Sequence, residues 1–493
     1  MAENMTSLPS SLSFALSVVQ GCSKNVFQIA SSTGASSVAP DGVIRFNLPS
    51  NSIMDWKRSK MNFSVETTAS TGARLPQYAD TLFSGVRIMV AGQTIVQNNN
   101  LHGIVKAVDY ITKQDVCDPI TGHPYVCEHQ QIDGDVISGV SVSETYAAGV
   151  GKISTLFSVD MGQIARISPR LIDMSLLGAV TVEFIVAPAT VLLAVKDTAQ
   201  RCDTATAGNF CVSHASSPSF TVERPVFNAV CYSLLSSSYQ MAIKERIASI
   251  GYVSFVYPQT TGFVMGQWQG SNRFSLSANS LRKLTSVWRN KLHASIRGGV
   301  PLAGRCAGNT VATGNCDGRF NGGLTNTAGE RHYQGSVQQF RWPNLLPAAD
   351  GITTATRATG LITAGVYADF HESVAPLDFQ FQVNSSNYPQ FSMGVADCLQ
   401  MTLDANNIDE LHDTPTLTEY LNNKFIVSAG FNLPHKVGDV PCLSGLNTTG
   451  QNAYFGLASV GTGNDSSSYE NIILAETDTI MRVGAMRQIE IIN

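Results

Sequence analysis

Charged side chains are scarce in this sequence. Only 14% of its 493 residues are Asp, Glu, Lys or Arg, whereas about 25% is usual in a soluble protein. Charge keeps the surface of a monomer soluble and discourages exposed strand edges from pairing with other chains. A long chain with so little charge is therefore predicted to cover much of its exterior with copies of itself.

Concentrated positive charge is missing as well. The formal net charge is -5, and the first 23 residues contain neither Lys nor Arg. Proteins whose main task is to neutralise phosphates need clustered Lys and Arg. The composition therefore excludes that task and a basic N-terminal arm, and it predicts no sequence-specific nucleic-acid partner.

Long apolar runs are absent too. No segment approaches the roughly 20 apolar residues that a bilayer-spanning helix needs, so no direct membrane insertion is expected. The apolar stretch 12–19 followed by Cys22 resembles a lipoprotein cleavage site, but Glu3 stands where a signal peptide carries Lys or Arg. An N-terminal arm over residues 1–24, or a first strand, is favoured over an export signal.

Cysteine is too rare for a disulfide scaffold, with ten in the whole chain. Six of the ten nevertheless form short-range pairs in loop-like sequence, each able to close a small loop. An intracellular protein would keep these thiols reduced. The candidate disulfide pairs are Cys117 with Cys127, Cys202 with Cys211, and Cys306 with Cys316.

One of these pairs lies in the densest group of potential metal ligands. Zinc sites need four ligands in tetrahedral geometry, and the spacing here matches no standard zinc finger. Two prolines in the same stretch indicate an irregular loop, so a plain loop or a disulfide is favoured over zinc, and no metal or cofactor is predicted. The four candidate ligands are Cys117, His123, Cys127 and His129.

Three further motifs fail as functional sites. Residues 149–154 resemble a phosphate-binding loop, but Tyr146 and Ile153 replace the required Gly and Ser or Thr. The acidic group 404–413 is not an EF-hand, because its sixth position, normally Gly, would be Asp409. No Gly-x-Ser-x-Gly nucleophile motif occurs. We therefore predict no active site and no enzymatic activity.

What the sequence does contain is a succession of short strands. Residues with alternating apolar and polar side chains predict half-buried strands, Gly92 predicts a hairpin turn, and helical periodicity is confined to a few connections. Long Gly-, Ser-, Thr- and Asn-rich stretches predict loops. The predicted strands are 61–65, 86–96 as a hairpin, 180–186, 219–235 and 379–383, the helices 101–111, 239–248 and two pieces of 392–423, and the loops 304–329, 348–360 and 445–468.

A short internal repeat divides the chain. The segment 45–53 (RFNLPSNSI) is similar to 273–281 (RFSLSANSL), which lies in the second half. This spacing fits two related β domains joined near residue 240.

The order of segments resembles that of the double jelly-roll major capsid proteins of icosahedral DNA viruses, as in virophages, polinton-like viruses and nucleocytoplasmic large DNA viruses. The similarity rests on segments spread over nearly the whole chain. Asn279-Ser280 stands where giant-virus relatives carry His-Pro, so the lineage within the family is left open. The matching segments are 46–53, 59–65, 82–88 with the following hairpin, 101–113, 225–235, 273–289, 381–389, 425–431, 444–448 and 472–493.

The resemblance implies an all-β fold of two tandem eight-stranded jelly-roll sandwiches, with an arm at 1–24, a first roll at 25–240 and a second at 241–493. It implies homotrimers that act as pseudo-hexameric capsomers of a virion shell and contact penton and minor capsid proteins, with loops such as 304–329 facing outward. A β-sandwich adhesin or carbohydrate-binding protein is the main alternative, and a β-sandwich hydrolase is a weaker one. Phe184, Phe381 and Val383 are predicted to face the sandwich interiors.

Overall fold

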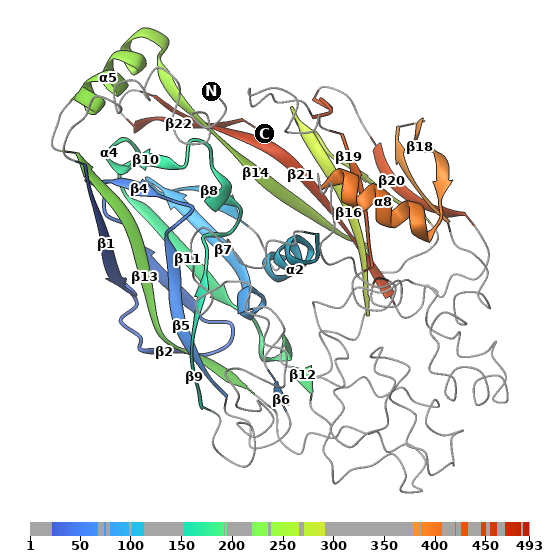
Figure 1. Ribbon diagram of the computed structural model, residues 1–493, viewed down its shortest axis with the longest axis horizontal. Coiled ribbons are helices and arrows are strands. Elements are labelled where there is room, and N and C mark those ends of the chain that lie inside the picture. Colours follow the sequence, from blue (N-terminus) through green and yellow to red (C-terminus); the bar gives the residue numbers. More distant parts are fainter. Residues whose placement is uncertain are drawn as a thin grey trace, which may run out of the picture.

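The computed structural model describes a chain built from two β-sandwiches connected by helices (Figure 1). Each sandwich has its own pair of sheets, and none of the sheets formed by the described strands runs through both. The described residues are 22–67, 73–74, 79–97, 101–112, 152–191, 193–194, 219–234, 238–265, 271–290, 378–384, 386–406, 420, 425–431, 445–449, 454–460, 469–484 and 487–492.

Sandwich 1 consists of eight main strands in two facing sheets. One sheet has the order β1-β13-β5-β9, and the other has the order β3-β11-β7-β8. The strands are β1 (Cys22–Ala30), β3 (Val43–Asn47), β5 (Lys60–Thr67), β7 (Phe83–Val90), β8 (Gln93–Gln97), β9 (Lys152–Val159), β11 (Val180–Val186) and β13 (Phe220–Leu234). Short additional strands extend it, namely β2 (Ser37–Val38), β4 (Ile53–Asp55) and β10 (Leu171–Asp173), while β6 (Ala73–Arg74) pairs with β12 (Leu193–Ala194).

Sandwich 2 repeats this plan. Its sheets have the orders β14-β21-β16-β19 and β15-β20-β17-β18, and β22 (Ile489–Ile492) adds to β21. Its strands are β14 (Tyr252–Met265), β15 (Ser271–Ser275), β16 (Leu281–Asn290), β17 (Asp378–Val383), β18 (Ser386–Met393), β19 (Ile426–Gly430), β20 (Tyr454–Val460) and β21 (Tyr469–Gly484).

The two strand orders are identical when the strands are counted along the chain. In each sandwich the first, eighth, third and sixth strands form one sheet, and the second, seventh, fourth and fifth form the other. This order defines a jelly roll, so the predicted all-β fold with two tandem jelly rolls is confirmed. We refer to the sandwiches as roll 1 and roll 2.

The helices occupy equivalent connections in the two rolls. Helix α2 (His102–Thr112) connects the fifth and sixth strands of roll 1, and α8 (Val395–Ala405) lies in the same connection of roll 2. Helix α5 (Ser238–Ile250) joins the rolls. The shorter helical turns are η2 (Ala79–Leu82), η3 (Gly162–Arg166), α4 (Met174–Leu177) and η4 (Ala189–Val191).

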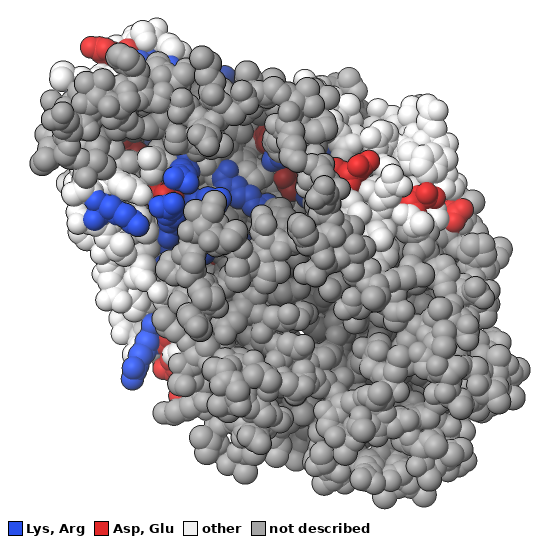
Figure 2. All heavy atoms as spheres, viewed as in Figure 1, with Lys and Arg blue, Asp and Glu red and all other residues white. Residues whose placement is uncertain are grey.

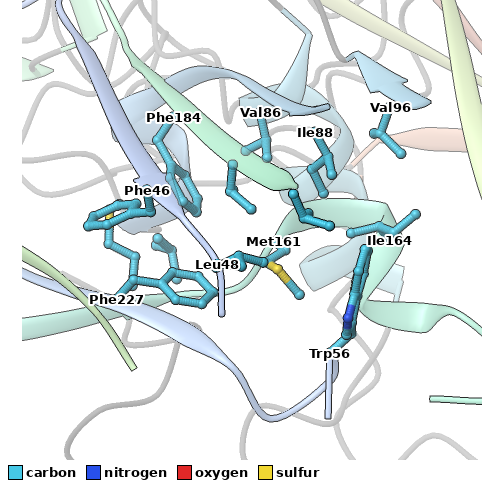
Figure 3. Packing of buried hydrophobic residues seen from close by; sticks show 14 of the residues in the cluster. Phe46, Leu48, Trp56, Val86, Ile88, Val96, Met161, Ile164, Phe184 and Phe227 are labelled. Atoms are coloured by element: carbon cyan, nitrogen blue, oxygen red, sulfur yellow. The ribbon is translucent and has the colours of Figure 1, made fainter. Parts of the chain in front are cut away.

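Alternating side chains fill the space between the sheets. In β3, Ile44 and Phe46 are buried while their neighbours are exposed, and Phe184 of β11 meets Phe46 edge to face with ring centroids 6.2 Å apart. Figure 3 shows these aromatic rings together with Trp56 and aliphatic side chains from several strands. Roll 2 has a separate core around Trp288 and Phe379, whose rings lie 4.8 Å apart. As predicted, Phe184 and Phe381 are buried, and Val383 packs partly buried against the roll 2 core.

The internal repeat has a structural counterpart. Residues 43–47 and 271–275 are the second strands of their rolls, β3 and β15. Phe46 and Phe274 point inward and are buried, whereas Arg45 and Arg273 are exposed. The repeated Arg-Phe pair therefore marks the same strand of the same fold twice.

Two expectations about secondary structure change. The stretch 445–468, predicted as a loop, contains β20, in which Phe455 and Leu457 face the core. Only two large apolar residues alternate there, and the small residues around them obscure the pattern. Strand β1 begins at Cys22, so it includes the last residues of the predicted arm 1–24. The other strand predictions named above and the helices at 101–111 and 239–248 are confirmed.

Candidate functional site

The candidate metal ligands and disulfides fall outside the described part of the chain. This applies to the ligands at 117, 123, 127 and 129 and to the cysteines at 202, 211, 306 and 316, so these predictions stay open. Within the described ranges, no three His, Cys, Asp or Glu side chains are grouped to hold a metal. Cys231 and Cys398 are buried there and form no disulfide, and burial raises the pKa of both thiols.

Two rejected motifs are partly described. Lys152 and Ile153 of the loop-like segment 149–154 are the first residues of strand β9. Asp404 lies in the last turn of α8, and the rest of the acidic group lies outside the described residues apart from Ala405 and Asn406. None of the described helices is both long and apolar enough to cross a bilayer.

The most elaborate site in the structure is the junction between the two rolls, where α2 lies (Figure 1). One side of α2 contacts η2 and β7 of roll 1. On its other side, Ile104 and Val108 pack against Ile426 and Ile472 from roll 2. Every described side chain of α2 from His102 to Thr112 is buried.

Because α2 lies between the two rolls, its charged side chains are buried as well. The Lys106 Nζ donates a hydrogen bond to Asp160 Oδ2 at 2.6 Å and lies 4.0 Å from Asp80 Oδ1. Asp80 also faces the Nε2 of His102 at 3.8 Å. Burial alone would raise the pKa of Asp160, but Lys106 and the Gly162 backbone N–H outweigh it and lower that pKa to about 2. The ion pair is therefore kept charged inside the protein.

A second ion pair connects α2 to η3 at the roll boundary. Arg166 donates to Asp109 Oδ2 at 2.6 Å. Burial works to lower the pKa of Arg166, but Asp109, together with Glu476 on roll 2, raises it above its usual value. Attraction to Glu476 links the charge network of roll 1 to β21.

Backbone hydrogen bonds also join the rolls. Ser168 and Val256 exchange two hydrogen bonds, at 2.8 and 2.9 Å. The Thr260 N–H donates to the Gln163 side chain at 2.8 Å, and the buried Tyr257 hydroxyl donates to the Ile95 carbonyl at 2.9 Å. The outer edge of β14, the first strand of roll 2, is thereby paired with the η3 segment of roll 1.

Among the described residues, the equivalent surfaces on the opposite sides of the rolls carry exposed side chains. Helix α8 packs on β19 through Cys398 and Thr402, but Ala396, Gln400 and Asp404 are exposed on successive turns. Strand β1, the counterpart of β14, pairs with β13 along one edge. Its Val26 and Phe27 side chains are 58% and 44% exposed and are neighbours on the strand.

Sequence reasoning identified α2 but not the junction. The apolar spacing of the helix predicted one buried face, whereas Lys106 and Asp109 have the composition of a solvated face. Their burial follows from contact with roll 2 and Asp160, which come from distant parts of the sequence. A pattern within one helix carries no signal for such partners.

Comparison with solved structures shows the same overall fold in viral capsid proteins. No protein-family model and no curated protein sequence matches the chain. The structure is similar to Vp54 of the virus PBCV-1, fitted into a reconstruction of the virophage Sputnik, with a TM-score of 0.52, 12% identity, and coverage of 96% of this chain and 97% of Vp54. It is also similar to the PBCV-1 capsid chain with the same values. The Faustovirus major capsid protein matches with a TM-score of 0.50, 9% identity, and coverage of 94% and 91%.

Proposed function

We propose that this chain is a major capsid protein that forms homotrimeric, pseudo-hexameric capsomers of an icosahedral virion shell. The observation that carries the proposal is the repetition of one strand order in two rolls, with a helix in the same connection of each. Structures with this fold include the capsid proteins of PBCV-1 and Faustovirus. Three chains with two similar rolls provide six similar bodies, which suits a six-sided building block.

The two connection helices support a contact between copies. In α2 all described side chains are buried, because roll 2 of the same chain covers the helix. Helix α8 occupies the same place in roll 2, and its exposed face carries Ala396 and Gln400. If neighbouring rolls in the trimer pack alike, roll 1 of the next chain covers α8.

The first strands of the rolls support the same arrangement. Ser168, which follows η3 in roll 1, pairs with Val256 at the edge of β14. The edge of β1 is the equivalent place on roll 1, with Val26 and Phe27 exposed near it. A second copy of the chain would bury these apolar side chains and supply partners for an edge strand. Such a head-to-tail contact closes into a ring when its rotation fits.

The remaining assignments belong to this proposal. We keep the predicted division into an arm at 1–24, roll 1 at 25–240 and roll 2 at 241–493, with the boundary in α5, except that roll 1 begins at Cys22, where β1 starts. Penton and minor capsid proteins are the expected additional partners, and the assembled virion is the expected location. The role requires geometry and contact surfaces, and it calls for no catalytic residue.

The experiment compares two helical alanines that are both exposed in one chain, Ala396 on α8 and Ala248 on α5. We expect light scattering of the purified protein to give a trimer, and electron microscopy to show particles with a hexagonal outline. Ala396→Glu places a charge in the proposed contact and should shift the protein to monomers, whereas Ala248→Glu should leave trimers. Unassociated wild-type chains under all assembly conditions would refute the proposal, and equal behaviour of both variants would refute the role of α8.

A further inference from the structure

Basic side chains gather at one end of roll 1 in a chain whose net charge is negative. Figure 2 shows Lys and Arg over the part of roll 1 where β4 and β10 lie. We call Lys24, Lys57, Arg58 and Arg170 the basic patch. All four are at least partly exposed.

Sheet pairing brings the patch residues together from three separate segments. Lys24 of β1 pairs with Tyr232 of β13, and Tyr232 pairs on its other side with Ile53 of β4. Strand β4 in turn pairs with β10, which Arg170 immediately precedes. The patch therefore crosses the end of one continuous sheet.

A buried carboxylate holds the two arginines. The Oδ2 of Asp55 lies 3.8 Å from the Nε of Arg58 and 3.7 Å from the Nε of Arg170. The Asp55 side chain is fully buried, whereas the two arginine side chains are 38% and 37% exposed. One carboxylate compensates only one of the two guanidinium charges, so the pair keeps a net positive charge at the surface.

The patch lies at the end of the sheet opposite the longest sequence connections of roll 1. Those connections return to the sheet at Lys152 and Phe220, which pair with Glu66 and Thr67 at the end of β5. The patch adjoins the beginning of β5, at Lys60. If long connections face the outside of a shell, as the proposed function implies, the patch faces the inside.

We propose that the basic patch binds the phosphate backbone of the enclosed double-stranded DNA without reading its sequence. This inference rests on the proposed capsid function. Guanidinium groups and lysine ammonium groups both suit phosphate oxygens. Four cations contact few phosphates, so binding by one chain is weak, and many chains in a shell bind together strongly. Such weak contacts guide a genome along the inner surface and leave it able to move.

The test measures binding of a fluorescent 30-base-pair duplex to the purified protein in its native oligomeric state, over a range of salt concentrations. Two duplexes of unrelated sequence should bind equally. Contact with three to four phosphates predicts a slope of about -3 to -4 for log affinity against log salt. Lys24→Gln with Lys57→Gln should lower the affinity at least several-fold and bring the slope to about -1 to -2, because two phosphate contacts are lost.

This double variant leaves the contacts of Asp55 intact, so its folding should be preserved and is checked by circular dichroism. The matched control is Arg224→Gln with Arg273→Gln, which removes the same charge from exposed positions outside the patch. The control should change affinity less than two-fold.

An equal loss in the control, or no loss in the patch variant, would overturn the proposal. Binding of anionic phospholipid vesicles that needs Lys24 and Lys57, without binding of DNA, would assign the patch to a membrane instead. Light scattering of the same samples separates the outcomes, because trimers that do not bind DNA refute this inference alone. Monomers would instead refute the proposed capsid function.

Discussion

Replacing Lys106 by Met should destabilise the protein by about 3 to 5 kcal/mol at pH 7. The Lys106 side chain is 7% exposed and lies 2.6 Å from Asp160, whose side chain is 13% exposed. Met fills similar space but carries no charge, so Asp160 and Asp80 lose their shared cation. Removing one partner of a buried ion pair costs about this amount, because an uncompensated buried charge remains.

The same change should alter how stability depends on pH. In the wild type, the pKa of Asp160 is lowered from 3.8 to about 2. A lowered folded-state pKa stabilises the protein above the unfolded pKa by about 2 kcal/mol, and this stabilisation is lost as the pH falls from about 4 to 2. Without Lys106, burial raises the pKa of Asp160. In acid, Asp160 therefore becomes protonated, and the uncompensated buried charge that destabilises the variant is removed. Its deficit should therefore be largest at pH 7 and smaller at pH 4.

Urea denaturation followed by fluorescence and far-ultraviolet circular dichroism measures both effects. Lys244→Met is the control, because Lys244 is an exposed helical lysine, and it should change the unfolding free energy by less than about 0.5 kcal/mol. Adding Asp160→Asn to Lys106→Met should recover part of the loss, since the amide oxygen still accepts from the Gly162 N–H. A loss below about 1 kcal/mol for Lys106→Met, or one independent of pH, would refute the reasoning.

Two further predictions concern roll 2 and the buried thiols. Gly445→Ala should destabilise the protein by about 1 to 3 kcal/mol in thermal or urea unfolding, because the added Cβ would lie 2.5 Å from the Leu281 carbonyl oxygen. The control is Gly394→Ala, whose Cβ would have its nearest contact at 3.7 Å and which should cost under about 1 kcal/mol. Equal losses of stability in the two variants would contradict this account. Cys231 and Cys398 should stay unmodified by a maleimide at pH 7 in the native protein and should react in urea, because burial excludes the reagent and raises both thiol pKa values. Mass spectrometry of peptides measures the labelling. Rapid labelling of either cysteine in the native protein would contradict this prediction.

Strands with strict alternation were predictable, because the apolar and polar residues within each strand indicate which of its faces is buried. The segment 180–186 has apolar side chains on one face and is strand β11 as predicted. Strand β20 was missed because Gly456 and Ala458 stand between its core residues, and small residues give no strong period. The short Arg-Phe repeat at 45–46 and 273–274 was informative, because both copies occupy the second strand of a roll.

The junction was beyond local patterns for a different reason. Lys106 forms its hydrogen bond with Asp160, which lies 54 residues later in the sequence. Val108 packs in one hydrophobic cluster with Ile426 from the other half of the chain. Both contacts exist only after two separate rolls have formed and docked. Hydrophobic periodicity describes one element at a time, so it predicts that α2 exists and leaves its second partner unknown.

The position of the last strand of each roll has a consequence for synthesis. Strand β13 lies inside its sheet and pairs with β1, β4 and β5, and β21 pairs with β14, β16 and β22. The first strand of each roll, β1 or β14, can therefore pair in its sheet only after the last strand, β13 or β21, has been synthesised. A chain that stops before Tyr469 lacks the strand that holds the sheet of roll 2 together, so an unfinished product cannot present the surface on which α2 packs. Formation of the junction between the rolls therefore depends on synthesis of the chain through β21.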